Sequence, residues 1–392
     1  MSRIRLAHTA DLHLGQDLPF LGSAGPRRAQ EKSHAFRDLL TICRDEGVQV
    51  LLIAGDFLEG SPPRSLVRTI SQYMEEADFL FFITPGNHDY MSLDSPYGLF
   101  PWPDNVHIFQ GPPERMDFPD LKLSVYGAAF PSAQLSRPLF EEEDWGRLLD
   151  QAKSDDPDWV HIALMHGDLV QGDRTSLYQP IRPSSWPRGL LSYVGLGHIH
   201  KPSPVQKRGT TSFAYSGTPM TSSFSNPGPQ GFYLGWVDSG GAQMDRRILP
   251  GPVFLEEEVD LSDCRTREDL DDLLFRRLSR YPDYQKNYYR VYLVGKRSEG
   301  LLVNAGDLEK SLGEDLSFLE LVDRSSPALN PHLLVEEKSP EGDFTRSLLD
   351  LAGKEIGDLE EGGDGRSRED RVLCLAWKLG LEAIQKERDQ TW

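Results

Sequence analysis

Five short segments of the sequence place carboxylate, imidazole and amide side chains where they could bind a metal ion. They are Asp11-Leu12-His13, Gly55-Asp56, Gly86-Asn87-His88-Asp89, His166-Gly167 and Gly197-His198-Ile199-His200. Each segment follows an apolar run with the length and composition of a β-strand. Carboxylate, imidazole and amide ligands without a thiolate favour divalent ions such as Mn, Fe or Zn over a structural zinc site. The ordered set therefore predicts a metal centre, although any one segment alone would more often be a turn.

The number of ligand-type side chains favours two ions rather than one. The candidates are Asp11, His13, Asp56, Asn87, His166, His198 and His200. One bridging carboxylate would divide them between two ions, and paired ions can hold the attacking and leaving oxygens of a phosphoryl group. The predicted chemistry is hydrolysis of a phosphate ester by metal-activated water.

The elements that must position these side chains alternate between strand and helix. Strands are expected at Ile4–Thr9, Val48–Ala54, Phe79–Thr84, Leu123–Ala129, Val160–Met165 and Tyr193–Leu196, with helices at Ala35–Arg44 and Ser65–Ala77. This alternation predicts a largely parallel sheet with functional groups beyond the carboxyl ends of its strands. Later runs at Phe213–Tyr215, Gly231–Val237 and Gln243–Leu249 predict a second sheet packed on the first. The expected fold is α/β, with two packed sheets flanked by helices.

Three parts of the chain are predicted. Residues 1–250 form a catalytic domain, and residues 251–340 form a small α+β capping domain. The capping domain is expected from runs at Val253–Val259, Arg267–Ser279, Tyr288–Gly295, Ala305–Leu312 and Leu316–Val322. Residues 341–392 hold an acidic, glycine-rich linker at Asp358–Gly365 and a last helix at Glu369–Arg388. The apolar surface of that helix could pack on its own domain or bind a partner.

Composition limits the partners of the chain. Its 392 residues carry a net charge of −19, which by itself argues against a polyanionic partner. Residues 174–208, however, contain six basic residues and no acidic one. Of these, Arg174, Arg182, Arg188 and Lys201 are candidates for substrate binding, with a solvated basic loop as the alternative. No apolar run is long enough to span a membrane and no signal-peptide pattern opens the sequence, so a cytoplasmic location is expected.

Taken in order, the five segments resemble the full motif set of calcineurin-like metallophosphoesterases. Pro62-Pro63, Ser216-Gly217-Thr218 and the α+β unit resemble more narrowly the SbcD-type DNA-repair exonuclease subunits. The resemblance implies two manganese ions. One would be held by Asp11, His13, Asp56 and His200, and the other by Asp56, Asn87, His166 and His198. It also implies that His88 touches the scissile phosphate, while Asp89 either orients His88 or caps a turn.

The same resemblance implies a function and partners. DNA would be the substrate of a nuclease in a repair complex, and an SbcC-like coiled-coil ATPase would bind the C-terminal region; a homodimer is a further option. Some members of the family carry a second histidine three residues after the bridging aspartate, where this chain has Glu59, and this leaves the role of that position open. A small-molecule phosphodiesterase or phosphatase and a non-catalytic scaffold are the alternatives. The additional C-terminal domain argues against the former, and the complete ligand set against the latter.

Overall fold

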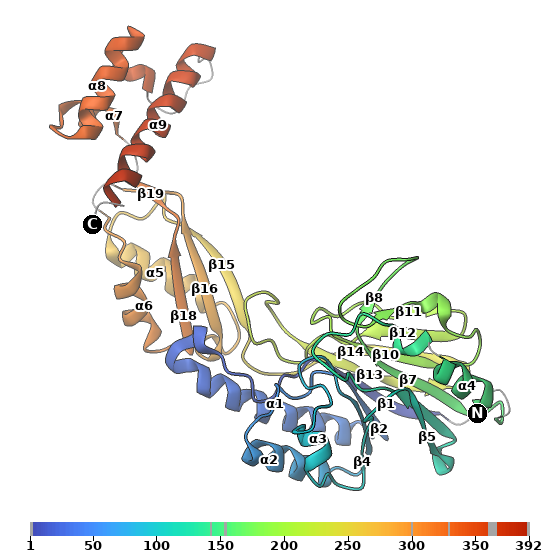
Figure 1. Ribbon diagram of the computed structural model, residues 1–392. Coiled ribbons are helices and arrows are strands. Elements are labelled where there is room, and N and C mark those ends of the chain that lie inside the picture. Colours follow the sequence, from blue (N-terminus) through green and yellow to red (C-terminus); the bar gives the residue numbers. More distant parts are fainter. Residues whose placement is uncertain are drawn as a thin grey trace. The chain divides into compact units, whose positions relative to one another are not determined.

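The computed structural model describes residues 3–141, 143–152, 155–298, 301–327, 330–359 and 367–389 (Figure 1). The chain divides into two compact units. The first unit contains residues 1–257, 281–290 and 310–320, and the second contains residues 258–280, 291–309 and 321–392. The three-part division after residues 250 and 340 stays a prediction.

The first unit is built on two six-stranded sheets. The first sheet has the order β14-β13-β1-β2-β3-β4, with β1 (Ile4–Thr9), β2 (Val50–Ala54), β3 (Leu80–Thr84), β4 (Val106–Ile108), β13 (Gly231–Asp238) and β14 (Gly241–Ile248). The second has the order β11-β12-β10-β7-β6-β5, with β5 (Glu114–Phe118), β6 (Leu123–Gly127), β7 (Val160–His166), β10 (Tyr193–Gly197), β11 (Gln206–Arg208) and β12 (Thr211–Tyr215). Strands β1 to β4 are parallel, as are β6, β7, β10 and β12.

The composition of the two sheets corrects the sequence prediction. Strands β13 and β14 were expected in the second sheet, but they extend the first, because β13 pairs antiparallel with β1 from Ile4 opposite Val237 to His8 opposite Tyr233. Strands β6, β7 and β10 were expected to continue the first sheet, and they form the second instead. Apolar spacing identifies each strand, but it does not specify which distant strand becomes its partner.

Alternating side chains of the strands fill separate hydrophobic layers. In β2, Val50 and Leu52 face the core between the two sheets, whereas Leu51 and Ile53 face the helices on the other side. The helices of this unit are α1 (Gly25–Asp45), α2 (Arg64–Glu75), α3 (Pro96–Leu99) and α4 (Glu143–Ala152). Residues of α1 and α2 join the core of the first sheet, and Trp145 of α4 packs on the second sheet. The prediction of two packed sheets flanked by helices is thus confirmed.

A smaller three-stranded sheet has the order β15-β16-β18. Its elements are β15 (Phe254–Asp260), α5 (Arg267–Leu278), β16 (Tyr288–Val294), α6 (Ala305–Gly313) and β18 (Phe318–Asp323). They follow the predicted β-α-β-α-β order. Two-residue strands form two further pairs, β8 (Asp168–Leu169) with β9 (Pro180–Ile181) and β17 (Lys296–Arg297) with β19 (Ser326–Pro327).

Three helices close the second unit: α7 (Pro331–Glu336), α8 (Pro340–Ala352) and α9 (Arg368–Asp389). The predicted last helix is α9, whose Trp377 packs with Leu349 of α8. Helix α8 was missed, since no element was predicted between the capping domain and the linker at Asp358–Gly365. The predicted linker itself lies mostly outside the described residues, which stop at Leu359 and resume at Ser367. Among the described helices, none has the length and apolar composition needed to cross a bilayer.

Candidate metal centre

The ends of five strands, three from the first sheet and two from the second, bring the predicted ligands together. Ligand atoms of Asp11, His13 and His200 lie within 4.8 Å of one another, and the same is true of Asp56, His166 and His198. The Oδ1 atom of Asn87 lies 3.0 Å from Nε2 of His166 and 3.1 Å from Nδ1 of His198. All seven candidates therefore fall into two adjacent groups.

Asp56 lies between the two groups. Its Oδ2 atom is 3.4 Å from Nε2 of His166 in one group and 3.9 Å from Nε2 of His13 in the other. Nε2 of His13 in turn faces Nε2 of His200 at 3.1 Å. Nitrogen and oxygen lone pairs that converge in this way repel one another unless a proton or a cation lies between them. The donor set therefore fits two divalent ions with a shared carboxylate.

Four of the ligands lie on a left-handed backbone, which is unusual for residues other than glycine. The φ angles are 55° at Asp11, 47° at His13, 49° at Asp56 and 102° at His198. Each such residue costs on the order of 1–3 kcal/mol, and such strain persists only where the surroundings impose it. Here neighbouring loops impose it, since Asp11 N donates to Gly55 O at 3.0 Å and His13 N donates to Asp56 O at 2.9 Å.

Asp89 organises the loop that carries Asp56. Its carboxylate accepts hydrogen bonds from the backbone amides of Asp56, Phe57, Leu58 and Gly86 and from the hydroxyl of Tyr97. The hydrogen-bond partner of the His88 ring is Glu59 instead. The hydrogen bonds of Asp89 therefore hold the loop of Asp56, as its capping role requires, and the bond to the His88 ring comes from Glu59.

Burial makes the charges of this cluster interdependent. It raises the pKa of Asp11 to about 8 and lowers the pKa of His198 to about 4. Burial would also lower the pKa of His166, but the negative charge of Asp56 outweighs this and raises it to about 9. Without metal, bound protons thus balance the charges of these side chains. Metal ions that bind there must displace those protons.

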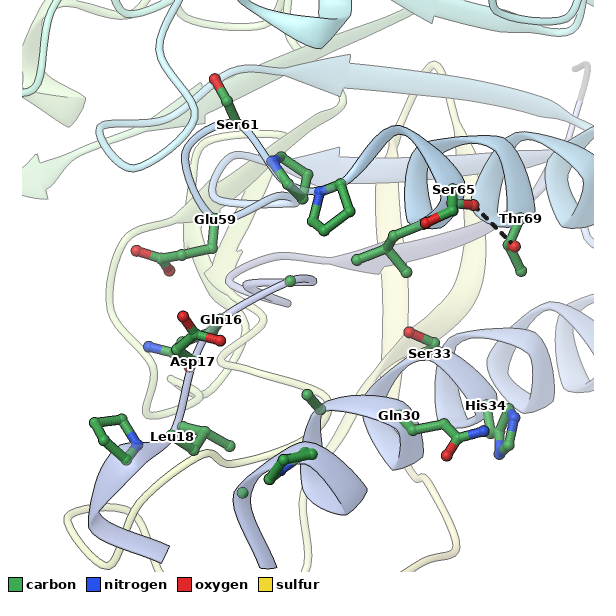
Figure 2. Close-up of a pocket in the computed structure, with 18 of the residues that line it drawn as sticks. Gln16, Asp17, Leu18, Gln30, Ser33, His34, Glu59, Ser61, Ser65 and Thr69 are labelled. Atoms are coloured by element: carbon green, nitrogen blue, oxygen red, sulfur yellow. Dashed lines mark hydrogen bonds between the residues drawn. The ribbon is translucent and has the colours of Figure 1, made fainter. Parts of the chain in front are cut away.

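His88 stands beside the ligands but is more accessible. Its side chain is 43% exposed, and its Nδ1 lies 2.9 Å from Oε1 of Glu59, a hydrogen bond that raises the pKa of His88. Glu59 also lies at one end of a groove of about 1290 Å³ between α1 and α2 (Figure 2). Its walls carry polar side chains, among them Gln16, Asp17, Gln30, Ser33, Ser61, Ser65 and Thr69.

The predicted basic residues divide into two kinds. Arg174, Arg188 and Lys201 are exposed, and their contact with substrate stays a prediction. The guanidinium of Arg182 is already engaged, because it donates to the carbonyl oxygens of Gly172 and Arg174 and pairs with Glu141 at 3.3 Å. Arg182 therefore holds its own loop.

Two residues near the centre were not found from the sequence. Asp168 Oδ1 lies 3.6 Å from Nε2 of His198, and the buried Lys32 donates from Nζ to the carbonyl oxygen of His13 at 2.9 Å. Asp168 follows His166 by two residues, a spacing that could have suggested it. Lys32 lies on an amphipathic helix, where nothing in the sequence distinguishes it from a surface lysine.

Comparison with known proteins agrees with this geometry. A model of the calcineurin-like phosphoesterase family matches residues 4–202, a range that contains all seven candidate ligands. The chain belongs to this family. Calcineurin-like phosphoesterases are phosphoester hydrolases with a dinuclear metal site, and the two ligand groups provide the residues for such a site.

Three relatives are similar over part of the chain. The SbcD subunit of the nuclease SbcCD of Bacillus subtilis is 28% identical over 256 residues, which is 57% of this chain and 64% of that protein. Proteins named DNA double-strand break repair protein Mre11 are each 27% identical: that of Methanopyrus kandleri over 61% of this chain and 55% of its own length, and that of Halobacterium salinarum over 66% and 63%. The chain thus spans less than two thirds of each relative.

Proposed function

We propose that this calcineurin-like phosphoesterase is a metal-dependent DNA nuclease and serves as the nuclease subunit of a DNA-repair complex. The observation that carries the proposal is the convergence of seven ligand side chains in two groups around Asp56, with His88 accessible beside them. Relatives named as a nuclease subunit and as double-strand break repair proteins support DNA as the substrate.

Two divalent ions, with manganese as the first candidate, would be held by the two ligand groups. When bound, such ions activate water and neutralise charge on the phosphate. The side chains themselves would be held by Asp89, which fixes the loop of Asp56, and by the backbone contacts between the loops that carry Asp11 and His13.

His88 forms a third candidate group with His13 and Asp56, but its side chain is far more exposed than theirs, which suits it to act on the substrate. Its Nδ1 is engaged by Glu59, which leaves Nε2 as the atom that can meet a phosphate oxygen. An imidazole at that place can donate a proton to the departing oxygen. We therefore assign His88 as the catalytic residue of the proposed reaction.

We also infer that an SbcC-like coiled-coil ATPase is the partner and that it binds helix α9. One face of α9, with Leu373, Trp377 and Leu381, is buried within the second unit. Another face exposes Val372, Leu375 and Leu379, which are 60%, 58% and 55% accessible. Apolar side chains at this helical spacing are typical of a face that lies in a partner's groove.

One assay separates the proposed function from its alternatives. The purified chain is incubated with manganese and labelled single- and double-stranded DNA, in parallel with bis-p-nitrophenyl phosphate and cyclic nucleotides. We expect cleavage of DNA and of the small diester, both lost in Asp56→Ala. Hydrolysis of cyclic nucleotides without cleavage of DNA would favour a small-molecule phosphodiesterase. Absence of hydrolysis of every substrate would favour a scaffold.

A further inference from the structure

We propose that Glu59 is a positioning residue that clamps two histidines of different function, His13 and His88. The clamp rests on hydrogen bonds of this chain, while its effect on cleavage rests on the proposed function. No role for this position followed from the sequence. Its side chain is 29% exposed and lies at one end of the groove between α1 and α2 (Figure 2).

The two oxygens of Glu59 bind different rings. Oε2 lies 2.8 Å from Nδ1 of His13, and Oε1 lies 2.9 Å from Nδ1 of His88. The two rings meet edge to face, with centroids 4.7 Å apart and planes at 88°. A single carboxylate therefore spans a candidate metal ligand and the candidate catalytic residue.

This geometry selects the position of the ring protons. An ionised carboxylate only accepts hydrogen bonds, so Nδ1 must carry the proton in both rings. Nε2 of His13 is then free to face Asp56 and His200, at 3.9 Å and 3.1 Å, as a metal ligand requires. Nε2 of His88 is left for the substrate. Glu59 thus fixes Nδ1 of both rings as the hydrogen-bond donor and directs Nε2 of His13 to the metal site and Nε2 of His88 to the substrate. To donate a proton, the His88 ring carries a second proton on Nε2 while Nδ1–H stays on Glu59.

The backbone around Glu59 ties the same two loops. Its amide donates to the carbonyl oxygen of Leu14, the residue after His13, at 3.0 Å. The amide of Gly60 donates to the carbonyl oxygen of His88, also at 3.0 Å. The backbone hydrogen bonds of Glu59 and Gly60 therefore hold the Glu59 carboxylate close to both the His13 and the His88 ring.

Substitutions can separate the clamp from a general effect of negative charge. Glu59→Gln keeps the shape, but its amide accepts from one ring only and presents N–H groups to the other. Glu59→Ala removes both hydrogen bonds. Asp17→Asn is the matched control, because it removes a negative charge from the same groove.

The direct test is histidine tautomer analysis by ¹⁵N NMR on the full-length, metal-free chain, with His88 assigned from a His88→Asn variant. We expect a proton on Nδ1 of His88 in the wild-type chain and in Asp17→Asn, and a changed Nδ1 signal in Glu59→Ala. An unprotonated Nδ1 of His88 in the wild-type chain, or a His88 signal unchanged by Glu59→Ala, would overturn the proposal. This readout does not require activity.

A kinetic test asks whether Glu59 acts through His88. Glu59→Gln should lower kcat on bis-p-nitrophenyl phosphate by about 10- to 100-fold with KM little changed, as is typical when the partner of a metal-site histidine is lost. In a His88→Ala background the loss should be smaller, because only the effect through His13 remains. An equal loss in both backgrounds would overturn the proposal. If the wild-type chain is inactive on every substrate, the proposed function fails and the tautomer experiment alone decides on the clamp.

Discussion

Among single residues, the candidate ligands that the sequence predicts lie together in the structure, but the contacts that support them were not predicted. Seven side chains of metal-ligand type can be recognised in a single sequence, because each segment that carries them follows an apolar run. The roles of Asp89 and Glu59 depend on rotamers and on contacts between loops far apart in sequence. The Asp89 carboxylate, next to His88 in the sequence, caps the loop of Asp56. The carboxylate that contacts the His88 ring is that of Glu59, from the loop after β2.

Gly86 should be intolerant of any side chain. A Cβ at this position would lie 2.3 Å from Oδ1 of Asp56 and 2.8 Å from Cε1 of His166. Gly86→Ala should therefore displace the bridging carboxylate and weaken metal binding. Gly111→Ala is the control, because its Cβ would meet no atom within 4 Å. Manganese titration of both variants checks this, and equal affinities would contradict it.

His88 should separate metal binding from chemistry. Since the seven other side chains complete both ligand groups, His88→Ala should bind metal as the wild-type chain does. It should lose cleavage by about 10²-fold or more, the scale of a removed acid–base catalyst. Metal analysis and turnover on a small diester are measured on the same preparation. Unchanged turnover would make His88 a structural residue.

His8 should make stability depend on pH. Burial lowers its pKa from 6.5 to about 3, while Nδ1 faces the hydroxyl of Tyr193 at 2.9 Å. Below pH 6.5 His8 is protonated in the unfolded chain but not in the folded chain. The contribution of His8 to the free energy of unfolding therefore falls by up to about 1.4 kcal/mol per pH unit. The difference in unfolding free energy between wild type and His8→Gln, measured by urea denaturation of the metal-free chain, should shrink as pH falls from about 7 to about 5. A difference independent of pH would refute this.

At the element scale, strands and helices were predicted more accurately than their partners. Strand β16 and helix α5 begin at the residues expected from the sequence, whereas β13 joins a different sheet from the one expected. Helix α8 was missed although it carries ordinary boundary signals: Ser339 caps it by accepting from Gly342 N, Pro340 occupies the first turn, and Gly353 ends it with φ 61°.

The buried face of helix α9 should stabilise the second unit, and its exposed apolar face should bind the partner. Trp377 is 1% exposed and its Nε1 donates to Oγ1 of Thr345 at 2.9 Å, so Trp377→Ala should destabilise the second unit by about 3–5 kcal/mol. The double variant Leu375→Glu, Leu379→Glu should fold normally and keep manganese-dependent hydrolysis of a small diester. It should nevertheless lose association with an SbcC-like ATPase in a pull-down.

The surface variant is a cleaner probe than a truncation. Deleting residues 366–392 would remove the partner-binding face, but it would also expose the core that Trp377 and Leu373 fill. Retained association of the double variant would show that this face of α9 is not the docking surface. Loss of thermal stability in the same variant would show instead that the face belongs to the core of its own unit.

At the scale of the whole molecule, charge is the main constraint on the proposed function. A chain with a net charge of −19 repels DNA, so attraction must be local. Two divalent ions would offset four of these negative charges at the metal centre, where the phosphate of the substrate would bind. The exposed Arg174, Arg188 and Lys201 could add to the local attraction of phosphate. The family was predictable because its motifs are local in sequence. The division into two units was not, because segments 281–290 and 310–320 belong to the first unit by long-range packing.

DNA affinity should therefore depend strongly on the metal. Removal of manganese with a chelator should weaken DNA binding in low salt, and added salt should weaken what remains, because phosphate contacts release counterions. Fluorescence anisotropy of a labelled oligonucleotide measures both effects. A DNA affinity that changes neither on removal of the metal nor on addition of salt would show that DNA binds away from the metal centre and without phosphate contacts.

Manganese stoichiometry tests whether two groups of ligands share Asp56. Calorimetric titration with elemental analysis should find two ions per wild-type chain. His200→Ala and His166→Ala should each lose one of them, because each residue belongs to one group, whereas Asp56→Ala should lose both. One ion or none in the wild-type chain at saturating manganese, or two ions retained in Asp56→Ala, would rule out a two-ion centre that shares Asp56.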